Sequence, residues 1–313
     1  MQQPFYEIKK ESKRNYGLLL SLIIGVLLLI VGEILSTLIQ SLLTVLFPHI
    51  PWEALEAQLF FFFPLLFVVL LWAKLVEKSP WQGLGMTKKN VGKDFFVGYG
   101  IGAAMLSLST LIMVVLGSAK IQGFHFTLDM LPRVILLIFA WIVQSSTEEI
   151  LTRGWLFSSV AAKRSVTVGL IASSLFFTVM HIGNEGISII PLLDLFLYGV
   201  LTALYMLKTN SIWGVCGIHA AWNFFQGSIF SFSVSGNNTD FSLVQISIQG
   251  PEWLSGGKFG VEGSIISVLI QAIFILWLIY DLKRKSHLVK KTETDKNKKI
   301  AFMDKFVDRK SVV

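Results

Sequence analysis

The sequence predicts an all-α fold, a polytopic bundle of about eight transmembrane helices. Of the 313 residues, 53% are hydrophobic and only 15% are charged, whereas soluble domains carry about 25% charged residues. The mean hydropathy is +0.66. Long apolar runs recur along the chain, and basic residues gather between alternate runs. A bilayer core of about 30 Å requires such runs, so an integral membrane protein is expected.

Each expected span is bounded by polar or turn-forming residues. The first lacks a signal-peptide cleavage site and is expected to remain uncleaved. The third begins with Gly98, Gly100 and Gly102, where small residues permit close helix approach. A turn at Lys163 and Arg164 separates the fourth from the fifth. The expected spans are 16–47, 59–76, 95–116, 131–162, 166–182, 187–207, 211–232 and 263–280.

The basic residues predict the orientation of the bundle. If the N-terminus lies inside, 23 of the 27 Lys and Arg residues fall on the inner side, so the positive-inside rule places both termini in the cytosol. Residues 1–15 form a cytosolic N-terminus and 16–280 the membrane domain. Residues 281–313 form a basic tail, expected to be disordered and to contact anionic lipid. The chain contains no basic-aromatic module, so nucleic acid is not an expected partner.

Three charged side chains interrupt the fourth span. Glu148, Glu149 and Arg153 lie where each charge costs about 2.5–3.5 kcal/mol at mid-bilayer. Glu149 and Arg153 are four residues apart, so they can pair on one helix face. Glu148 points about 100° away from its neighbour. We therefore expect one carboxylate to be neutralised and the other to be free for chemistry.

Polar residues on two later spans can reach the same depth. Phe177 and His181 lie late in the fifth span, and His219 and Asn223 share one face of the seventh. At 1.5 Å rise per residue, Glu148, His181, His219 and Asn223 lie about 14–24 Å from the inner ends of their spans. A single polar pocket between these helices is therefore expected.

The three motifs resemble those of a known family. E-E-x-x-x-R, F-x-x-x-H and H-x-x-x-N occur in this order on separate spans. In this the chain is similar to the CPBP family of CAAX proteases and bacteriocin-processing enzymes, intramembrane endopeptidases that include the type II CAAX prenyl endopeptidases. The resemblance covers about residues 131–226. It implies an eight-helix hydrolase of the prokaryotic plasma membrane that cleaves a membrane-anchored peptide or protein, which need not be prenylated. Relatives are linked to bacteriocin production, self-immunity and pheromone maturation.

The chemistry of these residues fits hydrolysis. A desolvated Glu148 is expected to deprotonate water, with His181 sharing the proton or orienting the water. Asn223 and His219 are expected to stabilise the oxyanion. Glu149, Arg153 and Phe177 are expected to support the site. Glu148, His181 and His219 could also hold zinc with an open position for water, so a metalloprotease and a glutamate-dependent protease both remain open.

Two other hypotheses compete with the protease. A non-catalytic membrane scaffold or regulatory partner of a kinase or transporter would tolerate loss of Glu148, and a proton-linked transporter would yield no cleaved product. No internal repeat supports a transporter. Cys216 is expected to be a buried apolar residue and Asp194 a bundle hydrogen bonder. The loop 233–261 is expected to be a connector.

Overall fold

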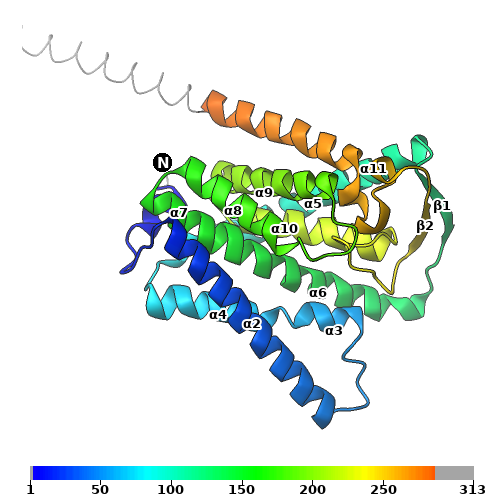
Figure 1. Ribbon diagram of the computed structural model, residues 1–313, viewed down its shortest axis with the longest axis horizontal. Coiled ribbons are helices and arrows are strands. Elements are labelled where there is room, and N and C mark those ends of the chain that lie inside the picture. Colours follow the sequence, from blue (N-terminus) through cyan, green and yellow to red (C-terminus); the bar gives the residue numbers. More distant parts are fainter. Residues whose placement is uncertain (1–2, 286–313) are drawn as a thin grey trace, which may run out of the picture.

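The computed structural model describes residues 3–285 and arranges them as a helical bundle (Figure 1). Six helical stretches are long and apolar enough to cross a membrane, and α8 is a shorter apolar helix. This confirms the predicted all-α polytopic bundle. The helices that build it are α2 (Leu18–Leu46), α3 (Leu55–Phe60), α4 (Phe63–Leu71), α5 (Val91–Val115), α6 (Leu131–Glu149), α7 (Ser158–Lys163), α8 (Val166–Met180), α9 (Ile189–Thr209), α10 (Trp213–Asn223) and the C-terminal helix Ile265–Lys285.

Three π-helical segments continue these helices. Trp72–Val76 extends α4, Ile150–Phe157 joins α6 to α7, and Phe224–Ile229 extends α10. With these extensions eight helical stretches of the described chain run through the bundle. The count agrees with the sequence, although the fifth and seventh are shorter than the six spans.

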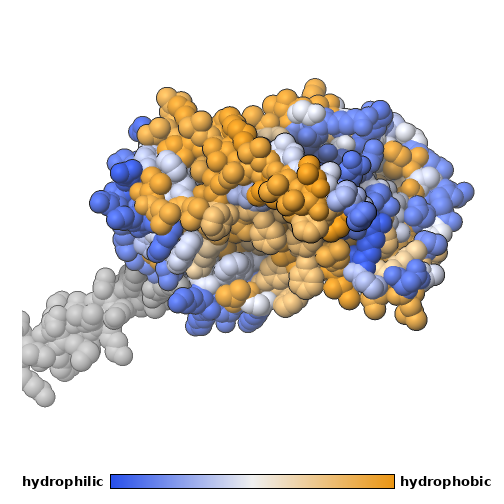
Figure 2. All heavy atoms as spheres, turned by 90° about the horizontal axis from the view of Figure 1, so that it is seen from below, coloured by the Kyte–Doolittle hydropathy of each residue, from blue (hydrophilic) through white to orange (hydrophobic). Residues whose placement is uncertain are grey.

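Apolar side chains cover the outside of the bundle between more polar ends. Figure 2 shows hydrophobic residues over the middle of one face and hydrophilic residues gathered toward both ends. Along α2, Leu19, Leu38 and Val45 are all more than half exposed. Apolar side chains stay exposed on this scale where they meet lipid. The surface therefore agrees with the membrane class that composition predicts.

The N-terminal segment packs against the bundle, whereas the sequence predicted only a polar cytosolic stretch. The short helix α1 (Phe5–Lys9) inserts Phe5 edge-on against Phe157, with ring centroids 5.5 Å apart. Lys9 is fully buried on Glu77, which also accepts a hydrogen bond from Trp155 at 2.9 Å. Burial lowers the pKa of Lys9, and the Glu77 carboxylate opposes that shift. This polar contact was invisible to hydropathy, because its partner is 68 residues away.

Helix α5 packs closely on α10 through glycines. A Cβ atom added at Gly98 would lie 1.9 Å from the Gly214 carbonyl oxygen, and one at Gly102 would lie 2.2 Å from that of Ile218. Gly100 meets nothing within 4 Å. The predicted close approach is therefore confirmed at Gly98 and Gly102 and is wrong at Gly100. Because α10 carries His219 and Asn223, this packing sets the position of both side chains.

Two segments expected to be irregular loops pair as a small sheet at one end of the bundle (Figure 1). Strand β1 (Ala119–Phe124) runs antiparallel to β2 (Val244–Ile248), with Lys120 opposite Ser247. Part of the loop 233–261 is therefore ordered against the bundle rather than being only a connector.

The last helix extends beyond the predicted boundary at residue 280. It continues to Lys285, and Lys208 at the end of α9 pairs with Asp281 at 3.2 Å. The prediction of a disordered tail from residue 281 is therefore wrong for residues 281–285, which continue the helix. Residues 286–313 of that predicted tail lie outside the described residues.

Candidate active site

Three polar residues of the predicted site lie where an α-helix becomes π-helical. Glu148 and Glu149 close α6 before the segment Ile150–Phe157, and Asn223 closes α10 before Phe224–Ile229. A π-helical turn changes the register of the backbone and therefore the direction of neighbouring side chains, and such turns recur at functional sites. Apolar periodicity gave no signal for either turn.

Glu149 is the centre of a buried charge cluster. Its Oε1 accepts hydrogen bonds from Arg153 Nη1 at 3.1 Å and from His219 Nδ1 at 2.9 Å. Glu149 and Arg153 are both completely buried. The predicted Glu149–Arg153 pair is therefore present, and it also orients His219. When Nδ1 of His219 carries the proton of this bond, Nε2 faces away from Glu149.

Glu148 points its second oxygen at His219. Its Oε1 accepts a hydrogen bond from Gln144 Nε2 at 2.7 Å, whereas Oε2 has no protein donor and lies 3.8 Å from His219 Nε2. Gln144 Oε1 in turn accepts from Asn223 Nδ2 at 3.0 Å. This chain of bonds fixes which way both amides point, because Gln144 must present its nitrogen to the carboxylate. Glu148 and Asn223 are thereby linked through Gln144.

His181 caps the C-terminus of α8 and is fixed by Phe177. Its Nδ1 lies 2.8 Å from the Phe177 carbonyl oxygen, which can only accept, so Nδ1 carries the proton and Nε2 is left free. The Phe177 ring lies 4.8 Å from the His181 ring, and the guanidinium of Arg153 lies 4.4 Å from the Phe177 centroid. Tyr198 from α9 packs edge-on against His219, with ring centroids 5.2 Å apart. Aromatic packing thus orients both histidines.

All four residues predicted to be catalytic line one cavity of about 710 Å³. Glu148, His181, His219 and Asn223 are each no more than 9% exposed, so they lie at its buried end. The wall also includes side chains from α2, the α2–α3 connection and α3. The depth comparison from the sequence therefore placed these four residues correctly in one pocket, and their catalytic roles stay predictions.

A part of the loop 233–261 forms another wall of this cavity, and Glu262 holds it there. Val234, Ser235 and residues 237–240 line the cavity. Glu262 Oε2 accepts from the backbone nitrogen and the hydroxyl of Ser235 at 2.8 and 2.9 Å, and from Gln226 Nε2 at 3.1 Å. Glu262 Oε1 accepts from Trp222 Nε1 at 3.1 Å. Since Trp222 and Gln226 flank Asn223, one buried carboxylate connects the loop to the helix that carries the site.

The predicted zinc ligands do not form a ready metal site in this arrangement. Within residues 3–285, no group of three or more His, Cys, Asp or Glu side chains is placed to hold a metal ion. Nδ1 of each histidine is bonded to a protein oxygen, as in metal-binding histidines, which leaves both Nε2 atoms free. Glu148, His181 and His219 as zinc ligands therefore stay a prediction, and no step below depends on a metal.

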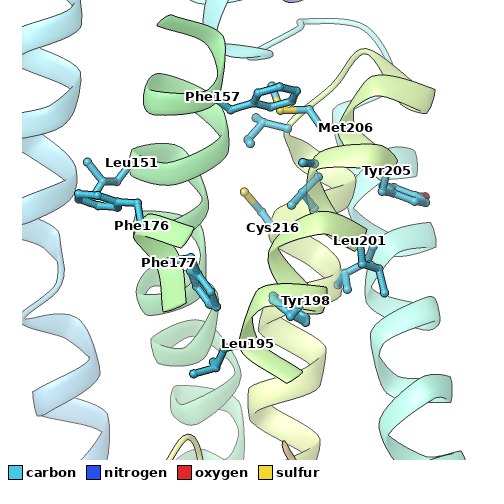
Figure 3. Packing of buried hydrophobic residues seen from close by; sticks show 14 of the residues in the cluster. Leu151, Phe157, Phe176, Phe177, Leu195, Tyr198, Leu201, Tyr205, Met206 and Cys216 are labelled. Carbon is cyan, nitrogen blue, oxygen red and sulfur yellow. The ribbon is translucent and has the colours of Figure 1, made fainter. Parts of the chain in front are cut away.

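The sequence analysis did not identify Gln144 and Tyr198 as residues of the site. It also considered Cys216 and Asp194, which lie outside the cavity. Gln144 precedes Glu148 by four residues, so the spacing that identified the Glu149–Arg153 pair could have found it. Tyr198 carries no such signal, because its contacts come from other helices. Cys216 lies among apolar side chains (Figure 3), and neither Cys216 nor Asp194 lines the cavity.

Comparison with known proteins agrees with these motifs. Residues 130–225 match the model of the family described as "Type II CAAX prenyl endopeptidase Rce1-like". No curated protein and no solved structure matches the chain. The matched segment runs from the start of α6 past Asn223 and contains all seven residues of the three motifs. The segment 130–225 is therefore assigned to the type II CAAX prenyl endopeptidase family by this match, which supports an intramembrane protease activity in general terms.

Proposed function

We propose that the protein is an endopeptidase that hydrolyses a peptide bond of a membrane-anchored protein or peptide, with Glu148 activating the water. One observation carries the proposal above all. Glu148 has a buried oxygen without a protein donor, 3.8 Å from His219 Nε2, and it lines one cavity together with His181, His219 and Asn223. A scaffold has no need of a free carboxylate at this depth, since burying it is costly.

Glu148 acts as the base in the proposed reaction. It takes a proton from water as the water oxygen bonds to the carbonyl carbon of the scissile peptide. When the tetrahedral intermediate collapses, the carbon–nitrogen bond breaks and Glu148 returns the proton to the leaving amine. The products are a carboxylate and an amine. His181 orients the water through its free Nε2, and Gln144 holds the carboxylate by its other oxygen.

Asn223 and His219 stabilise the oxyanion. Asn223 Nδ2 contacts Ser145 Oγ at 3.3 Å, the longer of its two bonds, and this is the bond it exchanges for the oxyanion. His219 donates through Nε2 only when both ring nitrogens carry a proton, because Nδ1 is bonded to Glu149. A single donor in this role lowers the barrier by about 3–4 kcal/mol.

The natural substrate class and the orientation belong to the same proposal. The substrate is prenylated or unprenylated, with bacteriocin or pheromone precursors and self-immunity as candidate contexts. Both termini face the cytosol of a prokaryote, and the basic tail contacts anionic lipid. In support, segments expected to be cytosolic meet at one end: the backbone nitrogen of Phe5 donates to Asn210 at 2.8 Å, and Lys208 pairs with Asp281.

A cleavage assay tests the proposal. Purified protein in liposomes is incubated with a panel of membrane-anchored peptides, prenylated and unprenylated. We expect cleavage by the wild type, a loss of about 10²–10⁴-fold in Glu148→Gln and of about 10²–10³-fold in Asn223→Ala. Cleavage that vanishes on chelation and returns with zinc would establish the metal-dependent alternative. An in-cell phenotype that survives Glu148→Gln, with no peptide cleaved, would favour the scaffold.

A further inference from the structure

The wall of the cavity that faces the proposed catalytic residues is acidic. Glu33 from α2 and Glu53 from the α2–α3 connection both line the cavity, and both side chains are exposed. In the described part of the chain, neither carboxylate forms an ion pair or accepts a side-chain hydrogen bond. Asp240 also lines the cavity, but Arg133 pairs with it at 2.7 Å. Glu33 and Glu53 are therefore the charges that the protein leaves uncompensated.

Glu33 reaches the layer of Glu148. Gly25 of α2 packs on Trp155, since a Cβ atom added at Gly25 would lie 3.5 Å from that ring. Eight residues further along α2 lead about 12 Å from this contact to Glu33. Seven residues back from Trp155, on a helix that runs antiparallel to α2 (Figure 1), lead about 10 Å in the same direction to Glu148. Gly32 fixes this part of α2, because an added Cβ would lie 2.8 Å from the Leu65 backbone.

No cationic side chain of the described cavity lining balances Glu33 or Glu53. Among the described residues that line the cavity, none is Lys or Arg, whereas four carry carboxylates: Glu33, Glu53, Glu148 and Asp240. These carboxylates are not gathered as a metal site either, since residues 3–285 contain no group of three or more His, Cys, Asp or Glu that could hold a metal ion. A positive group brought by the bound peptide would therefore meet negative charge that no side chain of the cavity lining compensates.

We propose that Glu33 and Glu53 select substrates that carry a lysine or arginine close to the scissile bond. This inference rests on the proposed endopeptidase function and adds the chemical class of its substrate. The basic side chain lies against the α2 side of the cavity while the peptide bond lies against Glu148. Neutral peptides lack this attraction, and acidic ones are repelled by both carboxylates.

Paired peptides that differ only in charge test the selection. Each set carries Lys, Gln or Glu at one position near the cleavage site, and kcat/KM is measured for wild type, Glu33→Gln/Glu53→Gln and Glu33→Lys/Glu53→Lys. We expect the wild type to prefer Lys about tenfold. In Glu33→Gln/Glu53→Gln the kcat/KM of the Lys peptide divided by that of the Gln peptide falls to about one. Glu33→Lys/Glu53→Lys prefers the Glu peptide. Glu11→Gln, which removes an exposed carboxylate outside the cavity, keeps the wild-type ratio.

A binding measurement separates this selection from the proposed catalysis. The dissociation constants of fluorescent Lys and Gln peptides are measured for wild type, Glu148→Gln and Glu33→Gln/Glu53→Gln in nanodiscs at low and high salt. Tighter binding of the Lys peptide that depends on Glu33 and Glu53 upholds the selection even if no peptide is cleaved, in which case only the endopeptidase fails. Equal binding and equal kcat/KM of the two peptides, or a Lys preference that persists in Glu33→Gln/Glu53→Gln, overturns the inference.

Discussion

The adjacent residues Glu148 and Glu149 have different environments, and we therefore expect them to have different roles. Glu149 compensates the buried Arg153 and orients His219, whereas Glu148 has one hydrogen bond from Gln144 and one oxygen without a protein donor. A paired carboxylate stabilises structure, and a carboxylate with a free oxygen can accept a proton.

Removing each glutamate should therefore have a different effect on stability. We expect Glu149→Ala to lower the free energy of unfolding by about 3–5 kcal/mol, because it leaves the Arg153 guanidinium buried without a counter-charge. Glu148→Ala should lower the free energy of unfolding by only about 1 kcal/mol, which is the net contribution of one hydrogen bond. Denaturant unfolding in detergent measures both. Equal losses in the two variants would contradict this division of roles.

At the residue scale the sequence predicts what depends on helical spacing. Four-residue spacing identified the Glu149–Arg153 pair and the shared face of His219 and Asn223. It could not identify the bond between His219 and Glu149, because the two residues are 70 positions apart and meet only when α10 packs on α6.

The elements that carry the site are positioned by backbone packing and by one buried carboxylate. Helix α10 is fixed by its glycine contacts with α5, and the loop 234–240 by Glu262. The sequence predicted a glycine contact for α5, but it could not say which glycines face α10. A helix that is apolar all round gives no periodic signal for its packed face.

Gly102 and Gly100 offer a matched pair of substitutions on α5. We expect Gly102→Ala to destabilise the fold by about 1–3 kcal/mol and to reduce cleavage, since the methyl group would push α10 away from its place. Gly100→Ala should be neutral or slightly stabilising, because alanine favours the helix and meets open space. Thermal unfolding and initial cleavage rates check both variants. A Gly100→Ala variant as impaired as Gly102→Ala would contradict the packing.

Glu262 is expected to act as a positioning residue through its four donors. In Glu262→Gln the new amide must face either Trp222 Nε1 or the three donors around Ser235, so one donor meets another. We expect KM to rise about tenfold, because the loop that lines the cavity loses its anchor. Steady-state kinetics on a cleaved peptide measures the change.

The double variant Trp222→Phe/Glu262→Gln supplies the control for that prediction. Because this variant has no indole N–H, the amide nitrogen can face the substituted ring without meeting another donor, while the amide oxygen keeps the three donors around Ser235. KM should then return toward the wild-type value. If the double variant is worse than Glu262→Gln alone, Glu262 does not position the loop in this way.

At the scale of the whole molecule, hydropathy predicted the class of fold and the number of helical stretches. It could not predict the buried place of α1, the pairing of β1 with β2, or the π-helical turns, because each depends on contacts between distant segments or on backbone geometry. The motifs predicted the family resemblance and the four residues that share the cavity, because motifs are local patterns that can be recognised on each helix separately.

The central claim is that Glu148 activates water for peptide hydrolysis in this cavity, and single-turnover cleavage in oxygen-18 water tests it most directly. With enzyme in excess over a membrane-anchored peptide, mass spectrometry follows the new carboxyl terminus in wild type and in Glu148→Gln. The account predicts one oxygen-18 atom in the wild-type product and a loss of about 10²–10⁴-fold in its rate of formation in the variant. Labelled product formed at an undiminished rate by a folded Glu148→Gln protein would contradict it.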